Sequence, residues 1–323
     1  MARTVDTARA SDAPAVRGVY LLTHPRSASN LFQTMMEKQP GYEKLGYKLF
    51  QASFAALGQL DKGRLSKWPE EERKALYDNF QTCFEKLEDE LEDAKKNGNQ
   101  VFVKEHAIFL AGPDKLFASL YPDDDPPAMV VRQRHEPPES VHTNPTSLPD
   151  SFMLSLQPIF QIRHPALMFP SMIRAMRDPD IRTPPFGSSA KVTLTLGHSR
   201  ALYDWYLAHG GELTPRIIDA DDIMNDRAAV RRLCIETGLD PDAVQYEWEE
   251  KHLEDPIQAR FLSTISKSKG ILPGLGSKGL NIETEKEKWK KEFGDKDGET
   301  LAGYVSDAMD DYNYMLSRRT RGE

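Results

Sequence analysis

Residues 24–30, which read His-Pro-Arg-Ser-Ala-Ser-Asn, have the composition of an anion-binding turn. They follow the apolar run 19–23 and precede a stretch with helical character. A turn from a strand into a helix directs free backbone N–H groups and the helix dipole at one point, which favours negative charge. The segment adds the positive charge of Arg26 and the side-chain donors of Ser27, Ser29 and Asn30. An ordinary polar turn with a Ser or Asn cap explains the same residues, and a Walker A loop is excluded because its Gly-Lys pattern is absent.

A second polar cluster, Lys104-Glu105-His106, ends the apolar run that begins at Val101. Residues two apart on an extended segment point to the same side, so Lys104 and His106 would face one site. A histidine near its ordinary pKa can take a proton from an attacking hydroxyl, and a lysine can stabilise developing negative charge. The alternative is a surface triplet that only closes a strand.

A third cluster combines Arg163, directly after the run 158–162, with Ser171 in the following helical stretch. An arginine at a strand end can bind a phosphate through two N–H groups, and the serine hydroxyl can add a donor. Pairing of Arg163 with a carboxylate is the alternative.

The elements that must hold these clusters alternate between strands and helices. Short β-rich runs predict strands, and 3- and 4-residue spacing of apolar side chains predicts helices. The predicted strands are residues 19–23, 101–104, 158–162 and 216–219, and the predicted helices are 31–38, 70–96, 166–176 and two around Leu202 and Val230. This alternation predicts an α/β fold with a central parallel sheet flanked by helices on both faces, in which ligands bind at the carboxyl ends of the strands.

Composition and charge restrict the class of protein. The 323 residues have a net charge of −8, which argues against a general nucleic-acid binder. Cys83 and Cys234 lie far apart in amphipathic stretches, which indicates buried thiols in a reducing compartment. We find no signal-peptide pattern and no run of about 20 apolar residues, and we expect a soluble cytoplasmic protein.

No linker divides the chain into two self-contained patterns. We therefore expect a flexible N-terminal segment at residues 1–16 and a single domain over residues 17–323. Residues 122–150 are rich in proline and polar side chains, which predicts a long irregular excursion. The histidines and cysteines lack metal-ligand spacing, so no metal site is predicted.

Together, the three clusters resemble the superfamily of sulfotransferases that use 3′-phosphoadenosine 5′-phosphosulfate (PAPS) as donor. Residues 24–30 are similar to its 5′-phosphosulfate loop, Tyr-Pro-Lys-Ser-Gly-Thr-Thr, with Arg26 at the lysine position. Arg163 and Ser171 match the Arg-x7-Ser pair that holds the 3′-phosphate. Residues 104–106 resemble the Lys-Thr-His segment, whose histidine is the general base.

Later segments resemble the family less closely. Residues 218–239 are similar to its Asp-Tyr-Glu-Asp-Leu…Val-Arg-Arg-Leu-Cys…Gly segment, although an ordinary strand–loop–helix would look the same. Lys278-Gly279 is similar to its late Arg-Lys-Gly motif, although a charged loop also explains this pair. Within the phosphosulfate loop, Ala28 stands at a glycine position, which matters if that residue needs a positive φ, and Asn30 replaces a threonine.

The resemblance implies a P-loop-NTPase-like sulfotransferase fold and an enzyme that moves a sulfuryl group from PAPS to a hydroxyl or amine of a small molecule. It implies His106 as general base, with Lys104 and Arg26 stabilising negative charge. The residues implied to contact the donor are Arg26, Ser27, Ala28, Ser29, Asn30, Arg163, Ser171, Lys278 and Gly279. No metal, nucleic acid or membrane partner is expected, and a homodimer is compatible with the sequence.

Three alternatives stay open at this point. A catalytically silent nucleotide-binding module would keep Arg163 and Ser171 and tolerate loss of His106. A kinase-like enzyme would need a Walker lysine, which is absent. In the third alternative, sulfation only activates a leaving group, and the net reaction is an elimination or a cyclisation. Residues 122–150 are a candidate for shaping the acceptor pocket.

Overall fold

The computed structural model describes residues 16–322 except 136, 138–139, 141 and 178–183. The segment 1–16, expected to be flexible, therefore lies outside the described residues apart from Val16. A five-stranded, all-parallel sheet with the order β2-β3-β1-β4-β5 forms the centre. Its strands are β1 (Gly18–Thr23), β2 (Tyr42–Leu45), β3 (Gln100–His106), β4 (Gln157–Ile162) and β5 (Arg216–Asp219). The predicted parallel sheet is confirmed, and so are the predicted strands.

Strand β2 is an edge strand that the sequence pattern does not predict. Of its residues only Leu45 is buried, so the segment shows neither an alternating nor a continuous apolar pattern. Pairing with β3 defines it, with Tyr42 opposite Gln100 and Leu45 opposite Val103.

Helices connect the strands and continue beyond β5. They are α1 (Ser29–Met35), α2 (Phe50–Leu57), α3 (Glu70–Lys96), α4 (Ala107–Leu110), α5 (Pro113–Ala118), α6 (Asp150–Met153), α7 (Pro165–Met176), α8 (Ser188–Thr193), α9 (Gly197–His209), α10 (Ala220–Asn225), α11 (Arg227–Thr237), α12 (Pro256–Phe261), α13 (Ser263–Ser266), α14 (Ile282–Phe293) and α15 (Asp295–Ser317). The predicted helices are confirmed with small differences at their ends.

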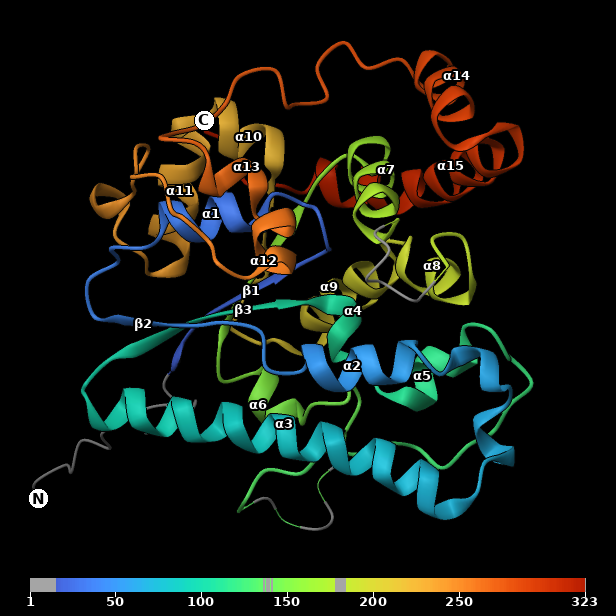
Figure 1. Ribbon diagram of the computed structural model, residues 1–323. Coiled ribbons are helices and arrows are strands. Elements are labelled where there is room, and N and C mark those ends of the chain that lie inside the picture. The colour runs from blue at the N-terminus through green and yellow to red at the C-terminus, as the bar shows by residue number, and fades with distance from the viewer. Residues whose placement is uncertain (1–15, 136, 138–139, 141, 178–183, 323) are drawn as a thin grey trace, which may run out of the picture.

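Both faces of the sheet are covered by helices, as Figure 1 shows. Alternate residues of β1 enter two separate hydrophobic clusters. Val19 and Leu21 pack in the cluster that contains residues of α1, α10 and α11. Tyr20 and Leu22 pack in the larger cluster, which contains residues of α2, α3, α7, α9 and α15. The strand is therefore buried on both sides, as the continuous apolar run 19–23 predicts.

The strand order brings the three polar clusters to one edge of the sheet. From β1 the chain forms β2 and β3 on one side and then crosses to form β4 and β5 on the other. Ligands of open parallel sheets bind beyond the carboxyl ends of the strands at such a switch point. Here β1 leads into the loop 24–28, β3 ends at His106 and β4 leads into Arg163.

The proline-rich excursion is irregular, as predicted, because the described part of residues 122–149 contains no helix or strand. It is nevertheless fixed to the core. Lys115 Nζ donates to the carbonyl oxygens of Asn144 and Thr146, both at 3.0 Å, and Ser147 N donates to Leu110 O at 2.7 Å. Helices α4 and α5 therefore hold the end of this segment.

The longest helices are α3, with 27 residues, and α15, with 23 residues. Each buries one apolar face and exposes charged residues on the other. Within the part of the chain that the structure describes, no helix combines the length and the apolar character needed to cross a membrane.

Gly18 begins β1 at a point where the backbone of β3 leaves no room for a side chain. A Cβ atom at Gly18 would lie 2.0 Å from the Val101 carbonyl oxygen, and the residue has a φ of +153°. We expect Gly18→Ala to lower the free energy of unfolding by about 3 kcal/mol, because β1 and β3 would have to separate at the centre of the sheet. Urea unfolding followed by circular dichroism measures this change.

Gly303→Ala is the matched control. Gly303 is exposed in α15, and a Cβ atom there would contact nothing within 4 Å. This variant should keep its stability or gain up to about 1 kcal/mol, the usual preference of a helix for alanine. Superimposable unfolding curves of the two variants would contradict the close approach at Gly18.

Candidate functional site

The loop after β1 turns sharply before it enters α1. Arg26 and Ala28 have φ values of 68° and 65°, and Ala28 is the N-cap residue of α1. This left-handed conformation costs a residue with a Cβ roughly 1–2 kcal/mol. Ala28 therefore does occupy a position that favours glycine. Two hydrogen bonds at Ser27 hold the turn, from Ser27 N to His24 O at 3.2 Å and from Gln161 Nε2 to Ser27 O at 2.7 Å.

His24 ties this loop to the end of α8. Its Nε2 lies 2.7 Å from the carbonyl oxygen of Thr193, and its Nδ1 lies 2.7 Å from that of Pro25. Burial lowers the pKa of His24, so the ring is neutral near pH 7 and can donate to only one of the two carbonyls. The loop after β1 and the segment after α8 are thereby held together.

The loop after β1 and the cluster after β4 meet at Arg26. Arg26 Nε donates to Ser171 Oγ at 2.9 Å and Arg26 Nη1 donates to Phe261 O at 2.9 Å. Arg163 donates to Arg26 O at 3.1 Å and to Leu275 O at 2.9 Å. The two predicted anion-binding clusters therefore form one continuous site.

Among the described residues, no acidic side chain contacts either arginine directly, and Asp221 and Asp219 act on the pKa of Arg163 only from a distance. Burial lowers the pKa of Arg26 and of Arg163, and their hydrogen-bond partners are carbonyl and hydroxyl oxygens. Among the described residues, none forms an ion pair with either guanidinium. The structure therefore does not show the alternative, in which Arg163 forms an ion pair with a carboxylate.

Two hydroxyl groups hold the His106 ring. Nδ1 lies 2.5 Å from Thr23 Oγ1, and Nε2 lies 3.0 Å from the hydroxyl of Tyr47. Thr23 donates its own hydrogen to Glu105 O at 3.2 Å, which assigns the ring proton to Nδ1 and leaves the lone pair at Nε2. Burial lowers the pKa of His106 well below its ordinary value, and Lys104 adds to the shift. His106 is therefore a neutral imidazole at pH 7.

Lys104 extends from β3 towards the loop after β1. Its Nζ donates to Asn30 Oδ1 and lies 4.7 Å from the centre of the Tyr47 ring. The side chain is 2% exposed, and burial lowers its pKa to about 7. A phosphate or sulfate beside Nζ would favour the charged form. Lys104 and His106 both lie against Tyr47, on one side of the strand, as their spacing predicts.

Glu105, between them, has a role that the sequence pattern does not reveal. Its Oε1 accepts hydrogen bonds from the backbone N–H groups of Lys48 at 2.5 Å and Leu49 at 3.1 Å. These bonds fix the start of α2 and the preceding residue Tyr47. Burial raises the pKa of Glu105 to about 7. Thr23 and Tyr47, which contact the His106 ring, are positioning residues that sequence reasoning missed. Tyr47 could not be found because it follows β2, a strand with no sequence signal.

The late segment around Lys278 reaches the same edge of the sheet. Asp221 Oδ2 accepts hydrogen bonds from Ser277 N at 2.8 Å and from Ser277 Oγ at 2.6 Å, and Arg163 contacts the carbonyl of Leu275. Lys278 and Gly279 are exposed, and the Lys278 side chain forms no hydrogen bond or ion pair with another described residue. Their contact with a donor stays a prediction.

Comparison with known proteins decides the family. The chain is 33% identical over 331 residues to Sulfotransferase ppzF of Metarhizium rileyi (strain RCEF 4871), with 94% of this chain and 96% of that protein covered. The chain belongs to the sulfotransferase family. This sulfotransferase is also 32% identical over 332 residues to Sulfotransferase ppzF of Metarhizium majus (strain ARSEF 297), with 94% and 97% covered. The resemblance drawn from the motifs is confirmed, and the protein is a transferase rather than a silent module or a kinase-like enzyme.

Two solved structures are similar to the sulfotransferase at lower identity. The Sulfotransferase Domain from the Synechococcus PCC 7002 Olefin Synthase matches with a TM-score of 0.43 and 15% identity, covering 93% of this chain and 98% of that domain. The Sulfotransferase Domain from the Curacin Biosynthetic Pathway matches with a TM-score of 0.43 and 12% identity, covering 88% and 98%. No family model matches the chain. No group of three or more His, Cys, Asp or Glu side chains suited to a metal ion occurs among the described residues.

Replacing Ala28 tests the strain in the loop of the sulfotransferase. Ala28→Gly should raise the free energy of unfolding by about 0.5–1 kcal/mol, because relief of the left-handed conformation exceeds the extra entropy of the unfolded glycine. Ala55→Gly, at an exposed position of α2, is the control and should lower it by about 0.5–1 kcal/mol. Urea unfolding compares the two, and a less stable Ala28→Gly protein would show that the alanine is not strained.

Proposed function

We propose that this sulfotransferase moves a sulfuryl group from PAPS to a hydroxyl or amine of a small molecule, with His106 as general base. The residues proposed to hold the 5′-phosphosulfate are Arg26, Ser27, Ala28, Ser29, Asn30 and Lys104. Arg163 and Ser171 would hold the 3′-phosphate, with Lys278 and Gly279 at the edge of the site.

The observation that carries the proposal is a group of one buried and two partly buried cations that form no ion pair with a described residue. Arg26, Lys104 and Arg163 form no ion pair with any residue that the structure describes. Buried positive charge is costly unless negative charge offsets it. Arg163 Nε and Ser27 Oγ are, in addition, buried and make no hydrogen bond to the described residues. A donor with an anionic group at each end supplies both the charge and the acceptors.

The proposed reaction breaks one bond at sulfur and forms another. The acceptor oxygen or nitrogen attacks sulfur, and the bond between sulfur and the 5′-phosphate oxygen breaks with its electron pair left on the phosphate. The acceptor proton passes to Nε2 of His106, which must first release the Tyr47 hydroxyl that lies 3.0 Å away, while Nδ1–H stays held by Thr23. Arg26 and Lys104 stabilise charge on the transferred group and on the leaving phosphate. Positioning and preorganised charge supply most of the acceleration, as in phosphoryl transfer.

Binding of the product 3′-phosphoadenosine 5′-phosphate tests the donor site. We expect a dissociation constant in the low micromolar range or tighter, and much weaker binding of ATP with Mg²⁺. Arg163→Ala should cost about 2–4 kcal/mol of this affinity, roughly 30- to 1000-fold, because it removes charge-assisted hydrogen bonds from a desolvated phosphate. Isothermal titration calorimetry measures both effects.

Arg174→Ala is the matched control, on helix α7, which begins two residues after Arg163. Arg174 is half exposed and forms a two-point pair with Glu292, with both distances at 2.7 Å. Its removal should leave nucleotide affinity unchanged. Equal affinity for ATP and the bisphosphate, or an unaltered dissociation constant in Arg163→Ala, would rule out the proposed donor site.

Turnover and its pH dependence test the role of His106. His106→Ala should keep bisphosphate affinity within about threefold while kcat falls ~10²–10⁴-fold, the usual contribution of a general base. Because burial lowers the pKa of His106, kcat/KM of the wild type should rise with pH along a limb below pH 6.5. The value of kcat/KM for PAPS, which reports the free enzyme, should fall again near pH 7, where Lys104 of the unoccupied site loses its proton. Screening small phenols, alcohols and amines provides the acceptor for this assay.

The variant should lose the rising limb and keep the falling one, since only the base is removed. A folded His106→Ala protein with near-normal turnover would show that the histidine only closes the strand.

A further inference from the structure

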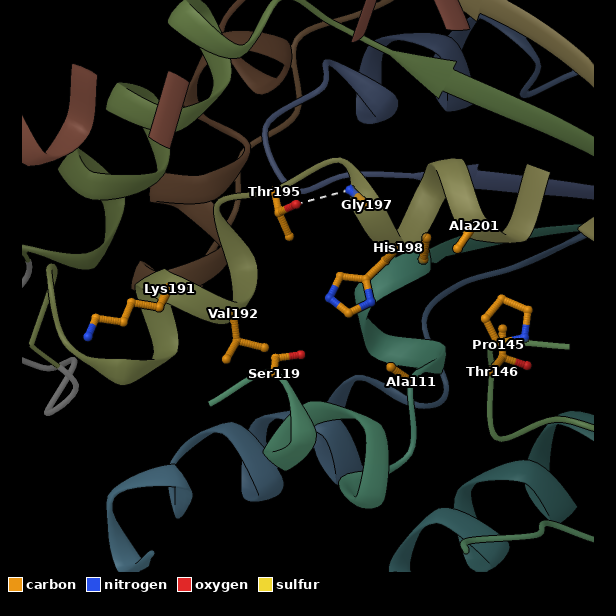
Figure 2. Close-up of a pocket in the computed structure, with 11 residues that line it drawn as sticks. Ala111, Ser119, Pro145, Thr146, Lys191, Val192, Thr195, Gly197, His198 and Ala201 are labelled. Carbon is orange, nitrogen blue, oxygen red and sulfur yellow. Dashed lines mark hydrogen bonds between the residues drawn. The ribbon is translucent and has the colours of Figure 1, made fainter. Parts of the chain in front are cut away.

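A cavity of ≈330 Å³ is lined by Ala107, which follows His106 in the chain, and by residues of the proline-rich segment, α8 and α9. Its walls come from the two ends of α4, from the end of the proline-rich segment and from the region of α8 and α9. Figure 2 shows the imidazole of His198 directed into this space between Val192 and Ala111. Its volume is within the range of sites that bind small molecules.

The cavity is linked to the base and to the loop after β1. Ala107, which lines it, directly follows His106 in the chain. Thr193, next to the lining residue Val192, holds His24 at the start of the loop by a 2.7 Å contact. Burial is the main cause of the lowered pKa values of His106 and His198, and His24 is close enough to both to lower them further. These links place the cavity near the proposed base and the loop after β1, whose own residues do not line it.

The lining favours a compact, largely apolar molecule. Small apolar groups form most of it, from Ala107, Ala111, Pro145, Val192 and Ala201. Hydroxyl groups and backbone add polarity, and none of the described lining residues is acidic. The one charged lining residue is Lys191, an exposed residue of α8 whose side chain extends outward, away from the other lining residues (Figure 2). A cationic acceptor would find no counter-charge here, whereas an anionic tail that leaves the cavity beside α8 could pair with the Lys191 ammonium outside it.

His198 supplies a neutral polar contact inside the cavity. Burial lowers its pKa to about 4, so the ring carries no charge at pH 7. A backbone hydrogen bond to Val192 occupies one ring nitrogen. The other nitrogen of a neutral imidazole is a hydrogen-bond acceptor, which suits a hydroxyl of the bound molecule.

We propose that this cavity is the acceptor site and that the acceptor is a small hydroxyl compound with an apolar body and an anionic tail. Lys191 selects the tail, and His198 holds a polar group of the body. Pro145 and Thr146 give the proline-rich segment its function as a wall of the site. The proposal rests on the proposed donor site, because the sulfuryl group must arrive from the neighbouring loop.

Three matched phenols test the acceptor class: 4-hydroxyphenylacetate, 2-(4-hydroxyphenyl)ethanol and tyramine, whose tails are anionic, neutral and cationic. Each is titrated into protein saturated with 3′-phosphoadenosine 5′-phosphate, and its dissociation constant is measured by ligand-observed NMR. The anionic phenol should bind two- to fivefold tighter than the neutral one, the weight of one exposed charge pair. Tyramine should bind weakest, and kcat/KM with PAPS should follow the same order.

Three variants locate the binding. Lys191→Met should remove the preference for the anionic phenol and leave binding of the neutral one intact. Ala201→Leu, which fills the cavity from α9, should weaken all three phenols at least tenfold. Ala208→Leu is its control, since Ala208 is exposed on the same helix and does not line the cavity. Bisphosphate affinity should be unchanged in every variant.

The results separate this proposal from the donor assignment. Three outcomes, each with tight bisphosphate binding, would overturn the acceptor site and leave the donor site standing. They are no detectable binding of any phenol, a preference for tyramine, and equal weakening of phenol binding in Ala201→Leu and Ala208→Leu. Failure of the bisphosphate to bind would overturn the proposed function itself. Loss of phenol binding only in Ala201→Leu, together with loss of the anion preference only in Lys191→Met, would support the proposal.

Discussion

The burial of positive charge at the carboxyl edge of the sheet is the constraint on which this site depends. Arg26 and Arg163 are held by backbone carbonyls and a serine hydroxyl, and Lys104 by the Asn30 amide. Such dipoles orient the cations but do not cancel their charge, as carboxylates would. The result is a positive site inside an acidic protein, with net charge −8 overall. The switch in strand order at β1 concentrates it, because three strand ends converge there.

Burial also determines the protonation states of three side chains at the end of β3. Lys104, Glu105 and His106 are consecutive ionisable residues, and each is buried. Desolvation moves the pKa of each group towards its neutral form, down to about 7 for the lysine, up to about 7 for the glutamate and well down for the histidine. A histidine that stays neutral at pH 7 keeps its lone pair, which is the form that a base requires. Glu105 meanwhile anchors the backbone before α2, and so Tyr47.

In the proposed assignment, the donor site lies at the sheet and the acceptor site in its surroundings. The strand ends provide the cations and the histidine, whereas the ≈330 Å³ cavity is walled by α8, α9 and the proline-rich segment. One contact, between His24 and the carbonyl of Thr193, joins the two parts. Variation in the outer segments can therefore change the acceptor without disturbing the strand ends. This is the usual arrangement when loops on a rigid scaffold carry specificity.

Local sequence alone determined the strands β1, β3, β4 and β5 and the residues that follow them, because buried parallel strands are short, continuous apolar runs. It also determined the family, since Arg26, His106 and the Arg163–Ser171 pair have recognisable spacing. Only tertiary structure decided the rest. Edge strand β2 has a single buried residue and exists through pairing with β3. Tyr47 and His106 are in contact although 59 positions separate them in the sequence. The cavity likewise brings His198 together with residues as distant in the sequence as Ala107. No local pattern encodes such contacts. The positive φ of Ala28 likewise arises because the loop must fit between β1, β4 and α1, against the preference of its own side chain.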